Sequence, residues 1–153
     1  MSGRTPSGKG DVGMRRVSVD MPGFGHANPI PAASRIGPFL ASGALTGRDP
    51  QTRQLPVSLD AQCANAFAHI RALMDAAGGS PDDILKLTVH LAEYRDREAL
   101  NREWEAMFPD PSSRPARQVL RGDLDGGALI HVDVLAVLSL APEEPPGTRT
   151  PGR

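Results

Sequence analysis

Cysteine, aromatic side chains and an excess of charge of either sign are scarce in this sequence. One cysteine, Cys63, cannot form an intrachain disulfide, and four histidines with one thiol disfavour a structural zinc site. Lys and Arg number 17 against 18 Asp and Glu, so no overall field attracts nucleic acid or anionic lipid. One Trp and one Tyr offer little surface for stacking RNA bases. We therefore expect no nucleic-acid partner, no membrane partner and no metal.

Long apolar runs are also missing. No stretch approaches the roughly 18 consecutive apolar residues of a membrane-spanning helix. The N-terminal residues lack the apolar core of a secretory signal peptide. A single cysteine is typical of a reducing compartment, where disulfides do not persist. Together these absences predict a cytoplasmic protein.

Glycine and proline, by contrast, are abundant, and they crowd the two ends of the chain. The sequence holds 16 Gly and 15 Pro, and the segments 1–13 and 142–153 are rich in them and poor in apolar side chains. Such segments bury too little to offset the backbone entropy of ordering, roughly 1–2 kcal/mol per residue. We predict disordered tails at 1–13 and 142–153 and one folded domain at 14–141, a length that suits a single core.

The spacing of apolar residues predicts two strands and a helix in the first half of this domain. Short runs at 14–20 and 38–42 are typical of strands, and Gly or Pro follows each of them. A helix is expected after Ser58, whose hydroxyl can cap it, until Gly78. Its buried face is predicted from apolar side chains that recur every three or four residues, which are Cys63, Phe67, Ile70 and Met74.

The clearest strand lies at 85–91, where apolar and polar residues alternate and predict one apolar and one polar face. The segment Ser80–Asp83 has the cap, proline and acids of a single helical turn just before it. After it, Asp96 can cap a second amphipathic helix, which Pro109 ends. This half of the chain therefore begins as turn, strand and helix.

Two further strands are predicted near the C-terminal end, at 117–121 and 128–140. The polar and glycine-rich segment 123–127 predicts a hairpin turn that joins them. The run 55–57 is compatible with one more short strand. Both helices are amphipathic, so we expect them to cover one face of a mostly antiparallel sheet in an α+β fold.

The second face of this sheet carries a mixture of residues that rarely faces bulk water. Alternation places polar and charged side chains there, together with apolar ones: Lys86, Thr88, His90, Arg117, Arg121, His131, Asp133, Val119, Leu135 and Val137. Apolar residues on a polar sheet face predict burial against another subunit, with the polar residues lining a crevice between chains.

Several segments, in this order along the chain, resemble the RidA/YjgF family of small trimeric imine and enamine deaminases, once described as translation inhibitors or endoribonucleases. They are Ala33-x-Arg35-x-Gly37 with Leu40–Gly43, Asp49-Pro50-x-Thr52, Ala76–Gly78 before Ser80–Ile84, Lys86-x-Thr88-Val89-x-Leu91, and Arg114–Arg117 with Ile130–Val137. The resemblance implies a chorismate-mutase-like fold with a mixed, mainly antiparallel sheet, two helices on one face and a homotrimeric barrel. It also implies a ligand cleft at each subunit interface and no cofactor.

The same resemblance assigns roles to individual residues. Arg117 matches the arginine that binds the substrate carboxylate, and a planar guanidinium suits this because it donates two parallel charge-assisted hydrogen bonds. Asp133 matches the acidic residue that orients the hydrolytic water. Ser42 and Gly43 match the segment that shapes the cleft. The implied reaction is the hydrolysis of 2-iminopropanoate- or 2-aminoacrylate-type acids to ammonia and a 2-oxo acid. His131, two residues before Asp133 and therefore on its face, is an auxiliary acid–base candidate.

The sequence also departs from the family pattern at the implied pocket. Ile30-Pro31-Ala32 stands where active members commonly carry Tyr-Ser-Gln, and Gln118-Val119 stands where many carry Ser-Cys. The last-strand acid is Asp133 instead of the more usual Glu, and His131 occupies an upstream acidic position. These replacements favour two alternatives to the small-substrate deaminase. One is a non-catalytic metabolite-binding protein of the Rid fold, and the other is a pathway-specific deaminase for a larger, aminomuconate-like substrate.

Each candidate residue also has a purely structural interpretation. Arg117 is compatible with a structural ion pair at a strand edge, and Asp133 with pairing to Arg117 or Arg121 across the sheet. Ser42 is compatible with an ordinary strand-end hydroxyl, and His131 with a hydrogen-bonded histidine. The family motif favours the substrate-binding role for Arg117.

Overall fold

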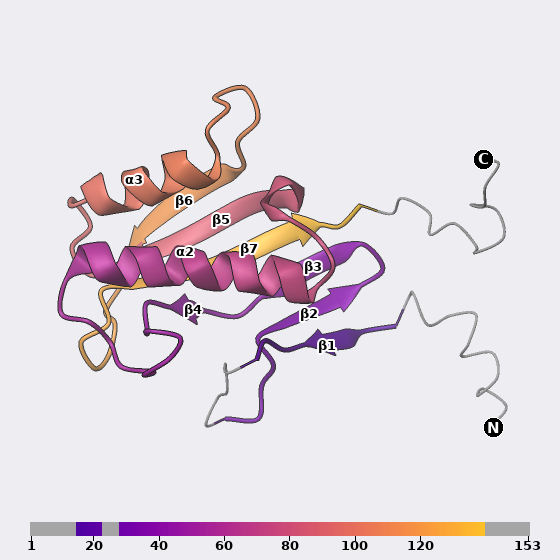
Figure 1. Cartoon of the computed structure of the whole chain (residues 1–153), viewed down its shortest axis with the longest axis horizontal. Coiled ribbons are helices and arrows are strands. Elements are labelled where there is room, and N and C mark those ends of the chain that lie inside the picture. The colour runs from indigo at the N-terminus through magenta and orange to yellow at the C-terminus, as the bar shows by residue number, and fades with distance from the viewer. Residues whose placement is uncertain (1–14, 23–27, 140–153) are drawn as a thin grey trace, which may run out of the picture.

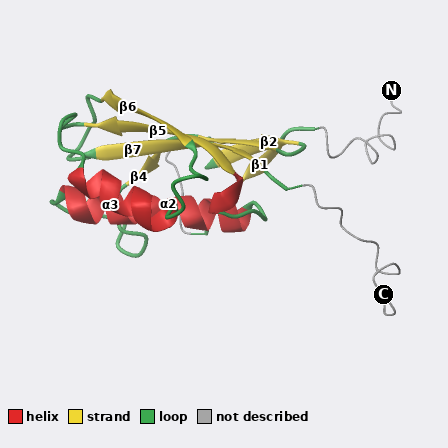
Figure 2. Ribbon diagram, turned by 90° about the horizontal axis from the view of Figure 1, so that it is seen from above, coloured by secondary structure: helices red, strands yellow, loops and turns green. Residues whose placement is uncertain are grey.

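A computed structural model describes residues 15–22 and 28–139. One seven-stranded sheet is covered on one face by two helices, and its other face is left open within the chain (Figures 1 and 2). The strands are β1 Val17–Val19, β2 Ala33–Ile36, β3 Phe39–Ser42, β4 Leu45–Thr46, β5 Ile84–Leu91, β6 Ala116–Arg121 and β7 Ile130–Val137, and the helices are α2 Leu59–Ala76 and α3 Glu98–Met107. The predicted tails at 1–13 and 142–153, and so the domain boundaries, lie outside the described residues. Neither α2 nor α3 is long and apolar enough to cross a membrane.

Helix α2 begins and ends where the sequence predicts. The Ser58 side chain accepts a hydrogen bond from the Ala61 amide, and the chain leaves the helix through Gly78 at a φ of +80°. Helix α3 differs, because its N-cap is Arg97 and has no side-chain cap. The predicted cap, Asp96, lies one residue too early, where its amide donates to the Glu93 carbonyl in the preceding turn.

The sheet has the order β1-β2-β3-β7-β5-β6, and β4 also pairs with β7. All neighbours are antiparallel except β5 and β6, which are parallel. The predicted hairpin at 123–127 is therefore wrong, because β5 lies between β6 and β7. The physical reason is the connection through α3: a strand followed by a helix crossover returns parallel to its predecessor and beside it. The segment 122–129 then passes the end of β5 to reach β7 (Figure 1).

The predicted strand at 55–57 is also absent. Pro56 has no amide to donate to a sheet, and its carbonyl accepts a hydrogen bond of 2.7 Å from the buried Gln62 side chain. The short strand of this region is instead β4, which pairs Leu45 with Val132 and Thr46 with His131.

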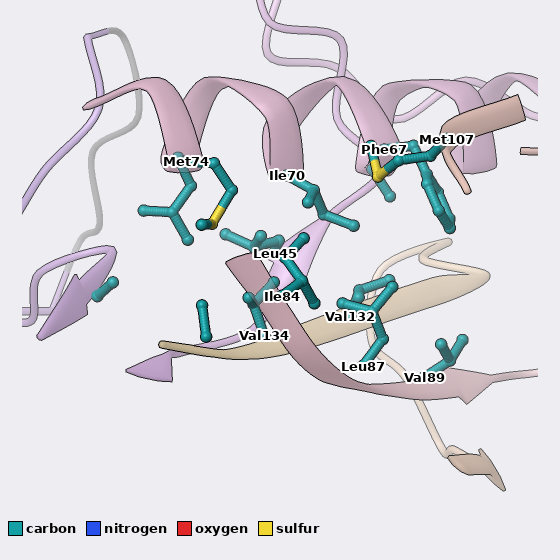
Figure 3. Packing of buried hydrophobic residues seen from close by; sticks show 14 of the residues in the cluster. Leu45, Phe67, Ile70, Met74, Ile84, Leu87, Val89, Met107, Val132 and Val134 are labelled. Atoms are coloured by element: carbon teal, nitrogen blue, oxygen red, sulfur yellow. The ribbon is translucent and has the colours of Figure 1, made fainter. Parts of the chain in front are cut away.

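The core lies between the two helices and the sheet, as Figure 3 shows. Leu85 is an exception to the alternation predicted for 85–91, because it is 55% exposed next to the shift in register between Ile84 and Lys86. From Leu87 onward the alternation is confirmed, since Leu87, Val89 and Leu91 are fully buried. They share the core with α2 side chains that the helical spacing identified, among them Phe67, Ile70 and Met74. This packing fixes which face of each strand looks away from the helices.

The open face is apolar near one end and polar near the other. At the apolar end the exposed side chains are Ile36, Phe39, Leu135 and Val137, of which Phe39 is 60% exposed, and Leu120 of β6, aligned with His90, is exposed on the same face. Its polar part holds Thr88 and Asp133, which are paired across β5 and β7, and His90 and His131, which are paired in the same way. These positions agree with the mixed face that the sequence predicts for β5 and β7.

Strand β6 is the exception. The parallel register aligns Arg117 with Leu87, Val119 with Val89 and Arg121 with Leu91. Residues aligned in this way point to the same side of a sheet, so all three belong to the helix-covered side, and Val119 packs against the core. The expectation that they share the open face with Asp133 is wrong. The error follows from the expected hairpin, which placed β6 beside β7.

Candidate active site

Arg117 lies on β6, at the edge of the sheet. The loop that leads into β6 is held by Arg114, whose Nε donates to the Phe108 carbonyl at 2.8 Å. The Arg117 guanidinium carbon lies 4.9 Å from the centre of the Trp104 ring on α3, within cation–π distance. Indole therefore covers one side of the guanidinium and helps to fix its plane.

One nitrogen of this guanidinium has no partner. Within residues 15–22 and 28–139, Arg117 Nη1 is the buried side-chain nitrogen or oxygen that makes no hydrogen bond. The ion pair in this part of the chain joins Arg102 and Asp60, so a structural ion pair does not account for Arg117. Burial, followed by the charge of Arg97, lowers the pKa of Arg117 from its ordinary value. A buried cation without an anion is costly, and a bound carboxylate would compensate it.

Two more arginines belong to this edge of the sheet: Arg121, four residues after Arg117 and on the same side of β6, and Arg97, the N-cap of α3, whose charge contributes to the lowered pKa of Arg117. The guanidinium carbons of Arg97 and Arg121 lie 4.6 and 5.6 Å from the centre of the Tyr94 ring. Arg97 also donates from Nε to the Tyr94 carbonyl at 3.2 Å. We call Arg97, Arg117 and Arg121 the arginine cluster.

Ser42, Gly43 and Asp133 meet at a second location, where β3 leaves β7. Ala41 pairs with Leu135 and Leu45 pairs with Val132, so the segment 42–44 stands opposite only Asp133 and Val134. We call this interruption the break. Asp133 itself remains paired with Thr88 of β5, so its backbone is fixed while its side chain lies on the open face.

The groups at the break already have partners within the chain. The Ser42 hydroxyl donates to the Gly43 carbonyl at 2.7 Å and accepts from the Val134 amide at 2.9 Å. The Gly43 amide donates to the Ala32 carbonyl at 2.9 Å, which brings the segment 30–32 to the break. Ile30 is 53% exposed. The roles in substrate contact that we predict for Ser42, Gly43, Ile30 and Val119 stay predictions.

The arginine cluster and the break are separated within one chain. In the sheet, Leu87 is aligned with Arg117 on one side and with Val134 on the other. Two strand spacings of about 4.8 Å therefore divide β6 from β7, and the side chains of Arg117 and Asp133 point to opposite faces. The structure does not bring these two predicted site residues together in a single protomer.

His131 lines a pocket at the polar end of the open face. The pocket has a volume of about 400 Å³ and is lined by Thr46, Arg48, Leu55, Asp123, Leu124, Asp125, Ala128 and His131. Burial, followed by the charge of His90, lowers the pKa of His131 below its ordinary value of 6.5. The neutral imidazole is therefore favoured in the folded chain. No three His, Cys, Asp or Glu side chains within the described ranges are grouped closely enough to hold a metal ion.

The lowered pKa of His131 makes stability depend on pH. Below about pH 6.5 the unfolded chain takes up a proton that the folded chain still resists, so His131 makes the folded chain less stable as the pH falls. We expect the melting temperature to fall between pH 7 and pH 5.5, and His131→Gln to reduce this slope. Thermal melts at both pH values, at one protein concentration, measure it. An equal slope in the two proteins would contradict the prediction.

No local sequence signal points to Arg97 or Tyr94 as residues of the site. Arg97 precedes a helix and Tyr94 follows a strand, and no spacing rule connects them with a residue on β6. The signal that could have found them is the β5–α3–β6 connection, which returns the chain to the same edge. Trp104 is both buried in the core and in contact with Arg117.

Comparison with known proteins agrees with this fold. The family model described as "Endoribonuclease L-PSP" matches residues 27–138. A RutC family protein of Pasteurella multocida is 31% identical over 127 residues, which cover 73% of this chain and 95% of that protein. The Escherichia coli K12 protein named 2-iminobutanoate/2-iminopropanoate deaminase is 29% identical over 104 residues, which cover 67% of this chain and 81% of that protein.

A solved structure of this family has the same fold. RidA from the Antarctic bacterium Psychrobacter sp. PAMC 21119 superimposes with a TM-score of 0.73 at 25% identity, and the match covers 80% of this chain and 99% of that one. The order of strands and the two helices on one face are therefore those of a known fold, and the resemblance of the sequence motifs is confirmed. The chain belongs to the RidA/YjgF family, to which the endoribonuclease L-PSP model corresponds.

Proposed function

We propose that this protein is a hydrolytic deaminase of small 2-imino and 2-enamino acids, which releases ammonia and a 2-oxo acid. The observation that carries the proposal is the buried, unbonded Nη1 of Arg117 beside Trp104. A guanidinium in this setting is suited to a carboxylate that comes from outside the chain. The Escherichia coli relative, whose name states this activity, supports the reaction class.

In the proposed reaction, the Arg117 guanidinium holds the substrate carboxylate and leaves the imine carbon open. Asp133 accepts a proton from the attacking water; the new C–O bond forms while the C=N π electrons move to nitrogen, which takes up that proton from Asp133. In the resulting tetrahedral carbinolamine the hydroxyl proton is transferred to the amino nitrogen, the C–N bond breaks as the carbonyl forms, and the amine leaves as ammonia. The products are ammonia and the 2-oxo acid. Water is the other reactant, so the balance requires no cofactor.

Because Arg117 and Asp133 lie on opposite faces of one sheet, we propose that each site combines them from two protomers of a homotrimer. Exposed Phe39, Leu135 and Val137 on the open face support an assembled state, since large apolar side chains gathered on a surface favour a protein contact. In such an assembly the arginine cluster of one protomer faces the break of its neighbour.

The proposal is tested by the release of ammonia and 2-oxo acid from 2-iminopropanoate generated in the cuvette. The wild-type protein should accelerate this release above the spontaneous rate. Asp133→Asn keeps the size of the side chain and removes its basicity, so we expect a fall of about 100-fold in kcat/KM. Asp133→Glu should retain more activity than Asp133→Asn.

Asp75→Asn, an exposed carboxylate on α2, is the matched control and should not change the rate. An Asp133→Asn protein as active as the wild type would overturn the role of Asp133. A wild-type protein that binds 2-oxobutanoate without accelerating imine hydrolysis would support the metabolite-binding alternative instead. Acceleration only with a larger ring-derived imino acid would support the pathway-specific alternative.

A further inference from the structure

The arginine cluster holds more positive charge than one carboxylate needs. Arg117 alone can bind a carboxylate in a bidentate manner. Arg97 and Arg121 flank the Tyr94 ring, and neither has a role in the proposed hydrolysis. Arg97 and Arg121 share the Tyr94 ring, and the charge of Arg97 contributes to the lowered pKa of Arg117.

No acidic side chain of the described chain neutralises this cluster. Glu93, Asp96 and Glu98 are close in sequence and exposed, but none lies within ion-pair distance of an arginine. Like charges repel, and the Arg97 and Arg117 side chains are partly buried, whereas Arg121 is exposed. An arrangement of this kind, with one buried nitrogen unbonded, is stabilised by an anion with more than one negative group.

The surface between the arginines is suited to a short carbon chain. Arg117, Val119 and Arg121 point to the same side of β6, so the aliphatic Val119 side chain lies between the two guanidinium-bearing positions. Trp104 adds an aromatic wall beside Arg117. A ligand with acidic groups at both ends and methylene carbons between them would match this order of charged, apolar and charged side chains.

We infer that the substrate of this site is a dicarboxylic 2-imino acid, whose second carboxylate is bound by Arg97 with Arg121. The inference rests on the proposed function for the reaction, and it adds the class of substrate. Arg117 binds the carboxylate next to the imine carbon, and Arg97, braced by Tyr94, binds the distal one.

The test separates binding from turnover. In the first arm, calorimetry measures the binding of succinate and of butanoate, two stable acids with equal numbers of carbon atoms, to the full-length protein. Succinate should bind the wild type at least about tenfold more tightly, because the distal carboxylate gains charge-assisted hydrogen bonds. Arg97→Gln should remove most of this difference. Arg121→Gln should also reduce the difference in affinity between succinate and butanoate. Because Arg121 is exposed, this variant replaces Arg97→Gln in the test if Arg97→Gln does not fold.

In the second arm, imino acids are generated in the cuvette from aspartate or from alanine by amino-acid oxidases. The ratio of kcat/KM for the dicarboxylic over the monocarboxylic substrate should exceed one in the wild type and fall about tenfold in Arg97→Gln. Arg95→Gln is the matched control. The Arg95 side chain is exposed on the same turn and is not one of the arginines stacked on the Tyr94 ring, so the ratio for Arg95→Gln should equal that of the wild type.

The outcomes distinguish the two proposals. Equal or undetectable binding of succinate and butanoate, or an equal loss for both acids in Arg97→Gln, overturns the dicarboxylate inference even if imines are hydrolysed. If an acidic side chain of a second copy occupied the cluster, succinate would show no advantage. A succinate preference that depends on Arg97, without acceleration of either imine, upholds the second anion site and overturns the deaminase.

Discussion

Arg117→Ala is expected to lower kcat/KM for 2-iminopropanoate on the order of 1,000-fold. The substitution removes two charge-assisted hydrogen bonds to the substrate carboxylate, each worth roughly 1.5–3 kcal/mol, and about 1.4 kcal/mol corresponds to a factor of ten. Arg117→Lys keeps the charge but not the planar pair of donors, so its activity should lie between those of the wild type and of Arg117→Ala. Ammonia release under saturating and subsaturating substrate measures both variants.

The stability of an apolar variant separates this role from a structural one. Since Arg117 Nη1 is buried and unbonded, Arg117→Met should leave the melting temperature unchanged or raise it, while activity is lost. A structural ion pair predicts the opposite, a loss of stability with activity reduced only through unfolding. An active Arg117→Ala protein would remove the proposed carboxylate contact.

Mixed trimers extend the same test to the proposed subunit interface. If each site takes Arg117 from one protomer and Asp133 from the next, a co-refolded equal mixture of Arg117→Ala and Asp133→Asn contains intact sites, about a quarter of the total for random assembly. We expect activity to reappear on mixing two inactive proteins. Continued inactivity of mixed trimers, with heteromer formation verified by mass spectrometry, would show that the two residues do not act in a shared interface site.

Gln62→Leu is expected to lower the free energy of unfolding by about 4 kcal/mol. The Gln62 side chain is fully buried and makes three hydrogen bonds: Nε2 donates to the Pro56 and Gly127 carbonyls at 2.7 and 3.0 Å, and Oε1 accepts from the Leu129 amide at 2.8 Å. Leucine has a similar volume but leaves the two carbonyls and the amide without a hydrogen-bond partner. Each of these groups that stays buried costs roughly 1–3 kcal/mol of stability. Urea denaturation at fixed protein concentration measures the loss.

Asn65→Leu is the matched control for Gln62→Leu. Asn65 is on the same helix, and its Nδ2 donates one hydrogen bond, to the Gly47 carbonyl at 2.9 Å. Its replacement should cost about 1 kcal/mol. Equal losses for the two variants would mean that Gln62 does not hold the segments around Pro56 and Leu129 to helix α2.

The sequence predicts those parts of the fold whose signals are local. The alternation in 85–91 identifies the central strand β5, and Ser58 with the apolar spacing after it identifies α2. Motifs in the correct order identify the family. None of these signals depends on which strands lie next to each other.

The position of β6 depends on a longer-range relation, and there the sequence interpretation failed. The glycine-rich turn at 123–127 is a strong local signal for a hairpin, but the crossover through α3 decides the neighbour of β6. Because side chains alternate between faces, the wrong neighbour for β6 leads to the wrong face for Arg117, Val119 and Arg121. Gln62 was missed for a similar reason, since its three partners come from segments distant in sequence.

Strand β7 pairs with β3, β4 and β5, although it is the last strand of the sheet in the chain. Apart from β7, no strand of the described residues joins the meander β1–β3 to the pair β5–β6. During translation the ribosome therefore exposes both units, with their apolar faces incomplete, until nearly all of the domain has emerged. The sheet can therefore be completed only late in synthesis. Until then we expect the nascent chain to be most prone to aggregation and to bind chaperones.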